Sequence, residues 1–173
     1  MLIVGIDPGK TGAIAVYDPA LGRAGPIHDM PVTGKDIDPV LVGEILREIA
    51  GIERPCAFIE RQQAYPGQGV STSFQTGRGF GIVLGAVGAM SWPCEVISAA
   101  KWKAGLKVTK DKDGARARAS QLMPEMAGEW RLKKHHGRAE AALMAYYGAL
   151  TLALPSAPHR PRGAPSLAAR STT

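Results

Sequence analysis

The sequence has little of what marks secreted, membrane-embedded or zinc-binding proteins. Its 173 residues include two cysteines, Cys56 and Cys94, which lie in apolar segments and form no Cys-x-x-Cys pair. We therefore expect two reduced core thiols and no structural zinc site. No run of eighteen apolar residues occurs, and the N-terminus has no charged region with a cleavage site. These absences predict a soluble, cytoplasmic protein with no membrane partner.

The length and composition predict one globular domain. At 173 residues and 45% hydrophobic content, the chain can bury one substantial core but not two. No internal repeat is visible. We assign residues 1–154 to the domain. The segment 155–173 is rich in Pro, Ala, Ser and Arg without an apolar period, so it is predicted to be a disordered tail.

Positive charge is concentrated in one region. The formal net charge is +6, yet residues 101–138 alone contain eleven Lys and Arg against four acids. A basic region of this kind within a domain is typical of a surface that binds a polyanion. A solvated face that only promotes solubility explains the charge equally well.

Turn signals and apolar patterns divide the chain into strands and helices. Asp38-Pro39 forms a cap and first-turn pair that predicts a helix start. The helix expected from about Ser71 to Met90 contains five glycines, a costly composition that suggests close backbone packing on the sheet or on a ligand. The predicted strands are 2–7, 12–17, about 25–31, 56–60 and 94–97, and the predicted helices are 39–50, 71–90, a short one after Ser98, one ending near 123, and 137–154.

Two of the apolar strands end on a carboxylate. Residues 2–6 (LIVGI) precede Asp7, and residues 56–59 (CAFI) precede Glu60. Such runs are typical of strands buried on both faces, whose carboxyl ends hold the chemistry of open α/β sheets. A buried acid needs compensation by a metal ion, a basic side chain or backbone donors.

A third acid lies on the last predicted helix. Glu140 shares a helical stripe with Leu143, Tyr147 and Leu150 and lies one turn after His136, so we expect it to point inward. Taken alone, an acid in a first helical turn suits the helix dipole, and a histidine there suits a cap. Together with Asp7 and Glu60, however, these residues could converge as oxygen and nitrogen ligands for Mg²⁺ or Mn²⁺.

This ordered set of motifs resembles the RuvC-type Holliday junction resolvases of the ribonuclease H-like superfamily. The resemblance covers residues 1–154. It rests on GIDPG at 5–9 with Thr11-Gly12, FIE at 58–60, the Gly-rich helix with Gln75 to Gly81, Lys101-Trp102-Lys103, Lys112, Arg116, and HGRAEA at 136–141. It implies a mixed five-stranded sheet, with three antiparallel strands followed by parallel strands, and helices on both faces.

The resemblance also implies an activity. It predicts an endodeoxyribonuclease, usually a homodimer, that resolves four-way DNA junctions by paired metal-dependent cuts. Asp7, Glu60 and Glu140 match the acidic metal ligands, and His136 stands where an acid is commoner, with His135 as an alternative. Two ions of Mg²⁺ or Mn²⁺ per site would serve phosphodiester hydrolysis. The host would be a bacterium or a phage-infected cell, or an organelle after transit-peptide removal.

DNA contacts are expected from basic and exposed residues. Tyr65, on the loop after Glu60, is a candidate for stacking at an opened base pair, although a Tyr-Pro turn needs no DNA to explain it. Trp102 is more typical of a core residue. The predicted DNA-binding residues are Tyr65, Gln75, Arg78, Lys101, Lys103, Lys107, Lys110, Lys112, Arg116, Arg118 and Arg138.

Two other functions remain possible on the sequence. A non-catalytic junction-binding protein could keep the same fold, and a metal-dependence assay would separate it from a nuclease. Gly9-Lys10-Thr11 resembles the end of a phosphate-binding loop, but Val4 stands where that loop needs glycine and a strand follows instead of a helix. We therefore expect no nucleotide cofactor.

Overall fold

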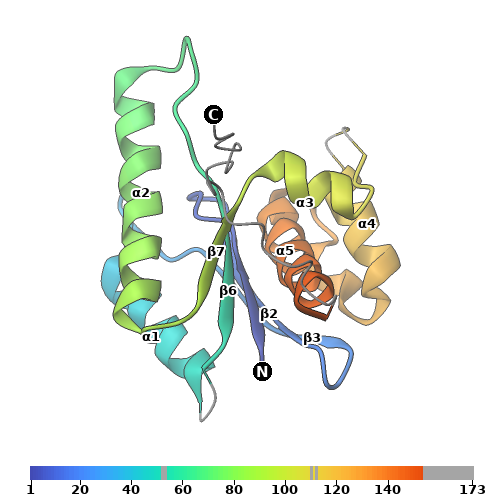
Figure 1. Ribbon diagram of the computed structural model, residues 1–173. Coiled ribbons are helices and arrows are strands. Elements are labelled where there is room, and N and C mark those ends of the chain that lie inside the picture. The colour runs from blue at the N-terminus through green and yellow to red at the C-terminus, as the bar shows by residue number, and fades with distance from the viewer. Residues whose placement is uncertain (52–53, 110, 112, 154–173) are drawn as a thin grey trace, which may run out of the picture.

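The computed structural model describes residues 1–51, 54–109, 111 and 113–153. A five-stranded sheet with the order β3-β2-β1-β6-β7 forms its centre (Figure 1). The strands are β1 (Ile3–Ile6), β2 (Ala13–Asp18), β3 (Arg23–Asp29), β6 (Cys56–Glu60) and β7 (Cys94–Ile97). Strands β1, β2 and β3 pair antiparallel, whereas β1, β6 and β7 pair parallel, as predicted.

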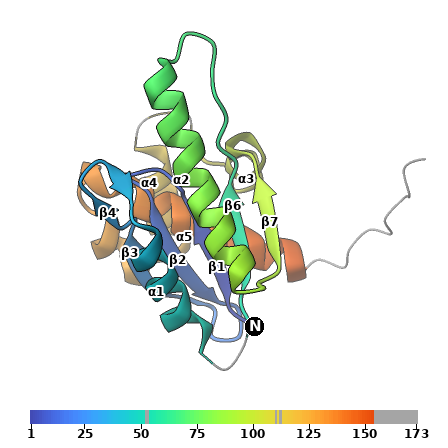
Figure 2. The same ribbon diagram turned by 90° about the vertical axis from the view of Figure 1, so that its left-hand side faces the viewer.

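Helices cover both faces of the sheet (Figures 1 and 2). They are α1 (Pro39–Ala50), α2 (Val70–Ala89), α3 (Ala99–Gly105), α4 (Gly114–Leu122) and α5 (His136–Ala153). Helices α1 and α2 lie on one face, and α3, α4 and α5 lie on the other (Figure 1). As predicted, Asp38 caps α1, where its carboxylate accepts hydrogen bonds from the backbone N–H groups of Val40 and Leu41.

Four short elements were not predicted. Strands β4 (Val32–Thr33) and β5 (Asp36–Ile37) form a hairpin around Gly34, whose φ of +64° suits a tight turn. Two 3₁₀ helices, η1 (Pro124–Trp130) and η2 (Lys133–His135), join α4 to α5. These elements are too short for a periodic pattern to reveal them.

The expected close packing of the Gly-rich helix α2 is wrong for most of its glycines. A Cβ at Gly77, Gly81, Gly85 or Gly88 would meet nothing within 4 Å, and only at Gly79 would one crowd the sheet side, 2.8 Å from Ile37 Cδ1. The closest backbone packing belongs to α5 instead. A Cβ at Gly5 of β1 would lie 2.0 Å from the carbonyl oxygen of Ala141.

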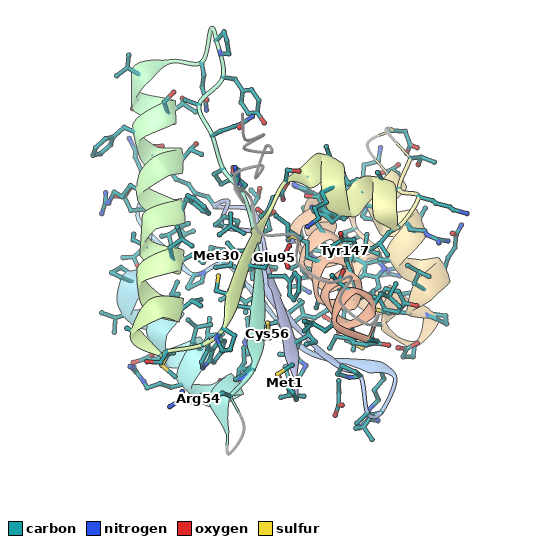
Figure 3. The ribbon with its side chains drawn as sticks, in the orientation of Figure 1. Met1, Met30, Arg54, Cys56, Glu95 and Tyr147 are labelled. Carbon is teal, nitrogen blue, oxygen red and sulfur yellow. The ribbon has the colours of Figure 1, made fainter. Side chains whose placement is uncertain are left out.

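Several side chains test the predicted core. Trp102 and Cys56 are buried as expected, but Cys94 is exposed because it begins the edge strand β7. Leu150 is 44% exposed, so the inward stripe of α5 ends before it. Side chains from both helical layers fill the space against the sheet, and Tyr147 of α5 lies beside α3 (Figure 3).

Some predictions fall outside the described residues. Lys110, Lys112 and the predicted tail 155–173 belong to this group. Within the part of the chain that the structure describes, no helix is both long and apolar enough to span a membrane.

Candidate metal centre

Three carboxylates meet at the edge of the sheet where β1 and β6 end. Asp7 follows β1, Glu60 is the last residue of β6, and Glu140 lies in the second turn of α5. Each offers a carboxylate oxygen within 4.8 Å of the others. The convergence of these acids, expected from the sequence, is therefore present in the fold.

Strand register brings the first two acids together. Strands β1 and β6 run parallel with Ile6 opposite Ile59, so Asp7 and Glu60 leave the sheet as neighbours. Both strands are buried throughout their apolar parts, which fixes their register.

The third acid is positioned by a close backbone contact at a glycine. Gly137, in the first turn of α5, packs on the loop after β1, where a Cβ would lie 2.1 Å from the carbonyl oxygen of Thr11. Only glycine permits this approach, which sets the start of α5 against the Asp7 turn. Glu140 follows one turn later and so faces Asp7.

The turn after β1 holds the Asp7 carboxylate in place. The backbone N–H of Gly9 donates to Asp7 Oδ1 at 3.0 Å, and the N–H of Gly12 donates to the carbonyl of Gly9 at 2.9 Å. A Cβ at Gly12 would lie 2.7 Å from Asp7 Cγ, so this glycine leaves room for the carboxylate.

Burial makes the negative charges of this site costly. Desolvation, followed by repulsion from Glu140, raises the pKa of Asp7 to about 6, although the Gly9 N–H and nearby His136 and Lys103 oppose the rise. Desolvation and the charges of Asp7 and Glu140 raise the pKa of Glu60 to about 7, with Lys103 opposing. Ionisation of Asp7 and Glu60 is thus unfavourable in the folded protein, and a bound cation would make it more favourable.

One lysine partly supplies that compensation. Lys103 Nζ of α3 donates to Glu140 Oε1 at 2.6 Å and lies 5.1 Å from the ring centre of buried Trp102. Lys103, predicted as a DNA contact, therefore reaches the acidic cluster itself. One ammonium opposite three carboxylates leaves a negative site.

The donor set fits a hard divalent cation. Carboxylate oxygens are the ligands that Mg²⁺ and Mn²⁺ prefer. Burial raises the pKa values of Asp7 and Glu60, and a bound cation would offset this by favouring their charged forms. The residues present therefore fit Mg²⁺ or Mn²⁺.

The two adjacent histidines face different surroundings. His136 begins α5 and lies close enough to Asp7 to lower its pKa. His135 instead lies close enough to Asp29 to lower the pKa of that acid. The buried Nδ1 of His135 has no hydrogen-bond partner among the described residues. Neither ring belongs to the group of mutually close ligand atoms formed by the three acids.

Most of the predicted DNA-contacting side chains already have partners within the chain. Arg78 pairs with Asp36 at 2.8 Å and Lys101 with Glu95 at 2.8 Å. Arg138 holds Asp29 through two hydrogen bonds of 2.6 and 2.7 Å. Tyr65 is 63% exposed on the loop after β6, and Lys107 is also exposed.

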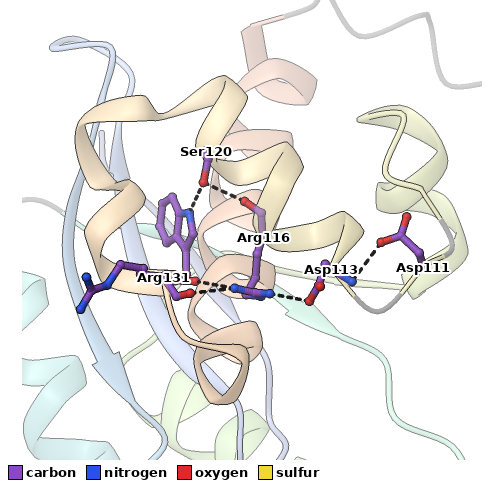
Figure 4. Close-up of polar contacts among 6 residues, drawn as sticks. Asp111, Asp113, Arg116, Ser120 and Arg131 are labelled. Carbon is purple, nitrogen blue, oxygen red and sulfur yellow. Dashed lines mark hydrogen bonds and ion pairs between the residues drawn. The ribbon is translucent and has the colours of Figure 1, made fainter.

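Arg116 and Arg118 link elements of the basic region. Arg116 Nη1 donates to the carbonyl of Arg131 at 2.9 Å, and its Nη2 pairs with Asp113 (Figure 4). Arg118 Nε donates to the carbonyl of Leu106 at 2.7 Å. These contacts tie α4 to the segment before α5 and to the end of α3, so both arginines contribute to the fold.

Sequence reasoning missed two cations near the Asp7 turn. Lys10 Nζ donates to Gln75 Oε1 at 2.9 Å, which joins the turn to α2, and Lys134 lies in η2. Both line a pocket together with Asp29, His135 and Arg138. The available signal for Lys10 was its place in the turn that follows Asp7.

Comparison with solved structures identifies the fold. The chain matches RuvC of Thermus thermophilus in complex with Holliday junction substrate, with a TM-score of 0.62 and 18% identity over 87% of this chain and 96% of that one. A second Thermus thermophilus RuvC structure matches with a TM-score of 0.60 and the same identity and coverage. The fold is thus the ribonuclease H-like α/β fold that the motifs implied. No protein-family model and no curated protein sequence matches the chain.

Proposed function

We propose that this protein is a metal-dependent endonuclease that nicks four-way DNA junctions. The observation that carries the proposal is the buried triad Asp7, Glu60 and Glu140 at the strand ends of a RuvC-like fold. An architectural protein has no use for three converging carboxylates, two of which, Asp7 and Glu60, have raised pKa values, whereas phosphodiester hydrolysis does.

The arrangement of the strands and α5 supports a ligand assignment. Asp7 follows β1, which pairs with the strand of Glu60 and packs against the helix of Glu140, and we assign it as the central ligand. Glu60 would bind on one side and Glu140 with His136 on the other. His136 is favoured over His135 because its charge acts on Asp7 and that of His135 acts on Asp29.

Mg²⁺ or Mn²⁺, two ions per site, would supply activation of the attacking water and stabilisation of the leaving 3′-oxygen. The chain's own residues would do the rest. The acids hold the ions, Lys103 tempers their repulsion, and cations on α3 and around the start of α5 hold phosphates without reading bases. Tyr65 remains a candidate for stacking at an opened base pair.

The test is cleavage of a synthetic four-way junction against a linear duplex of the same sequence. With Mg²⁺ or Mn²⁺ added, we expect nicks in the junction and little cleavage of the duplex. Equal cleavage of both DNAs would contradict structure selectivity. Tight junction binding without cleavage under any divalent ion would favour the non-catalytic alternative.

Paired nicking predicts a homodimer, because each subunit would cut one of two opposing strands. Sedimentation of the protein with a junction should give two chains per DNA. A complex of one chain per junction that nicks a single strand would contradict this part of the proposal.

A further inference from the structure

A polar pocket of about 280 Å³ lies beside the acidic cluster, on the outer side of the turn that follows Asp7. Its lining comes from three separate parts of the chain, namely the turn, the end of β3 and the start of α5. The lining residues are Lys10, Thr11, Gly12, Asp29, Lys134, His135 and Arg138. Three cationic side chains therefore face one anionic side chain.

The single acid of this pocket is already neutralised. Asp29 accepts hydrogen bonds from Arg138 Nε at 2.6 Å and from Arg138 Nη2 at 2.7 Å. This bidentate pair, together with the charges of His135 and Lys134, holds the pKa of Asp29 below its usual range. Arg138 also pairs with Glu129, which lies outside the pocket lining, at 3.2 Å. Asp29 and Glu129 therefore hold the guanidinium in place, and neither forms an ion pair with the two lysines.

The lysines have no acidic partner among the described residues. Lys10 bonds only to the neutral amide oxygen of Gln75, and Lys134 makes no ion pair in the described part of the chain. Further polar groups of the lining residues are unpaired. The backbone N–H groups of Lys10 and Thr11 make no hydrogen bond within residues 1–51, 54–109, 111 and 113–153, and buried His135 Nδ1 is likewise unpaired.

The pocket shares a wall with the metal centre. Gly12 lines it and also touches Asp7, since a Cβ at Gly12 would lie 2.7 Å from Asp7 Cγ. A group bound here would thus lie one turn of backbone away from the proposed reaction centre.

We infer that this pocket is a phosphate subsite. It holds a backbone phosphate that neighbours, along the same DNA strand, the phosphate at which that strand is cut. Lys10, Lys134 and the backbone donors of the turn bind its oxygens, and Arg138 is held in place by Asp29. Two uncompensated ammonium groups with free N–H donors match a phosphate diester. The place of this phosphate along the DNA strand rests on the proposed function, whereas the binding of phosphate in the pocket does not.

A neighbouring pocket serves as an internal comparison. A pocket of about 200 Å³ on the other side of Lys10 is lined by neutral polar groups of Gln62, Thr72, Gln75 and Thr76. It contains no second cation. Of these two pockets, only the one lined by Lys134 and Arg138 has the cluster of positive charge that would select phosphate.

Titration of the metal-free protein with inorganic phosphate, followed by amide NMR, tests the subsite without requiring nuclease activity. We expect saturable shifts at Thr11, Gly12 and His135. The double variant Lys10→Gln/Lys134→Gln should lose them, whereas Lys133→Gln should keep them. Lys133 is the matched control because it adjoins Lys134 but faces Asp113. Shifts that are absent, or that persist in the double variant, would overturn the inference.

Junction binding in metal-free buffer at several salt concentrations tests the role in DNA recognition. Loss of one phosphate contact should lower the slope of log affinity against log salt by about 0.9 in the double variant and leave it unchanged in Lys133→Gln. Equal slopes in the wild type and the double variant would overturn the DNA role. If the wild type fails to cleave junctions while phosphate still binds, the proposed function fails and the subsite stands.

Discussion

At the scale of single residues, the metal-free site opposes folding. Asp7 is 8% exposed, and burial raises its pKa from 3.8 to about 6. For an acid with a raised pKa, the folded state binds more protons than the unfolded state between those two values. The resulting loss of stability is absent below pH 4 and fully present above pH 6, at about 3 kcal/mol for Asp7.

We therefore predict that the metal-free protein loses stability as pH rises from 4 to 7. Thermal unfolding in the presence of a chelator should show Tm falling across this range, and added Mn²⁺ should reverse the fall. Glu60→Gln should flatten the profile by removing one raised pKa, while Glu44→Gln on exposed α1 should not. A Tm that rises from pH 4 to 7 with chelator would contradict the description of the site.

His136 allows a second prediction at this scale. Imidazole suits Mn²⁺ better than Mg²⁺, which prefers oxygen ligands, so the wild type should be more active with Mn²⁺. His136→Asp should retain cleavage and shift the preference towards Mg²⁺, and His136→Ala should lose most activity.

The adjacent histidine provides the control for that assignment. His135→Ala should keep the metal preference of the wild type, because its ring lies towards Asp29. Full activity in His136→Ala with loss in His135→Ala would transfer the ligand role to His135. Full activity in both variants would leave the pair with no part in the metal site.

At the scale of elements, the position of α5 decides whether the acids meet. The strand ends at Asp7 and Glu60 were predictable because an apolar run that stops at an acid is visible in sequence. The position of α5 was not predictable, because it depends on two contacts between distant parts of the chain, one of Gly5 with Ala141 and one of Gly137 with Thr11. Hydrophobic patterns do not reveal contacts made by the absence of a side chain.

The glycines of α2 illustrate the same limit from the other side. Five glycines in one helix suggested close packing, yet four of them face open space. Composition showed that these glycines lower the stability of a helix, but it did not show that the close backbone contacts are made by α5 instead. Similarly, Cys94 was assigned to the core from its apolar neighbours, but its place at the start of an edge strand exposes it.

We predict opposite effects for alanine at two helical glycines. Gly137→Ala puts a methyl group 2.1 Å from the carbonyl oxygen of Thr11, so it should destabilise the protein by about 1–3 kcal/mol and reduce cleavage by displacing Glu140. Gly81→Ala, at an exposed position of α2, should stabilise the protein by about 0.5–1 kcal/mol. Denaturant unfolding measures both. Equal stability of Gly137→Ala and the wild type would contradict the packing argument.

At the scale of the whole molecule, the basic region has two parts. Arg116 and Arg118 donate hydrogen bonds to carbonyl groups and join elements, so they contribute to the fold, and their predicted contact with DNA stays a prediction. Lys107 and Lys134 of this region have no acidic partner among the described residues and are exposed, as is Lys10 outside it. The net charge alone could not separate these two groups, because it contains no information about partners.

The arrangement of layers explains why the three acids gather at one edge of the sheet. Parallel β1 and β6 end at that edge, and α5 begins there, while α1 and α2 cover the face of the sheet opposite α5 (Figure 2). The family resemblance predicted a mixed sheet of three antiparallel strands followed by parallel strands, and the pairing of the five strands confirms it.

The most direct test of the central claim is single-turnover cleavage of a four-way junction by Glu60→Gln beside the wild type, with Mn²⁺ and with junction affinity measured on the same samples. We predict that the wild type cleaves and that Glu60→Gln loses cleavage by at least about a hundredfold, about 2.7 kcal/mol in activation free energy, with junction binding unchanged or tighter. Cleavage by Glu60→Gln at the rate of the wild type would contradict the assignment of the buried acids as a metal-dependent nuclease site.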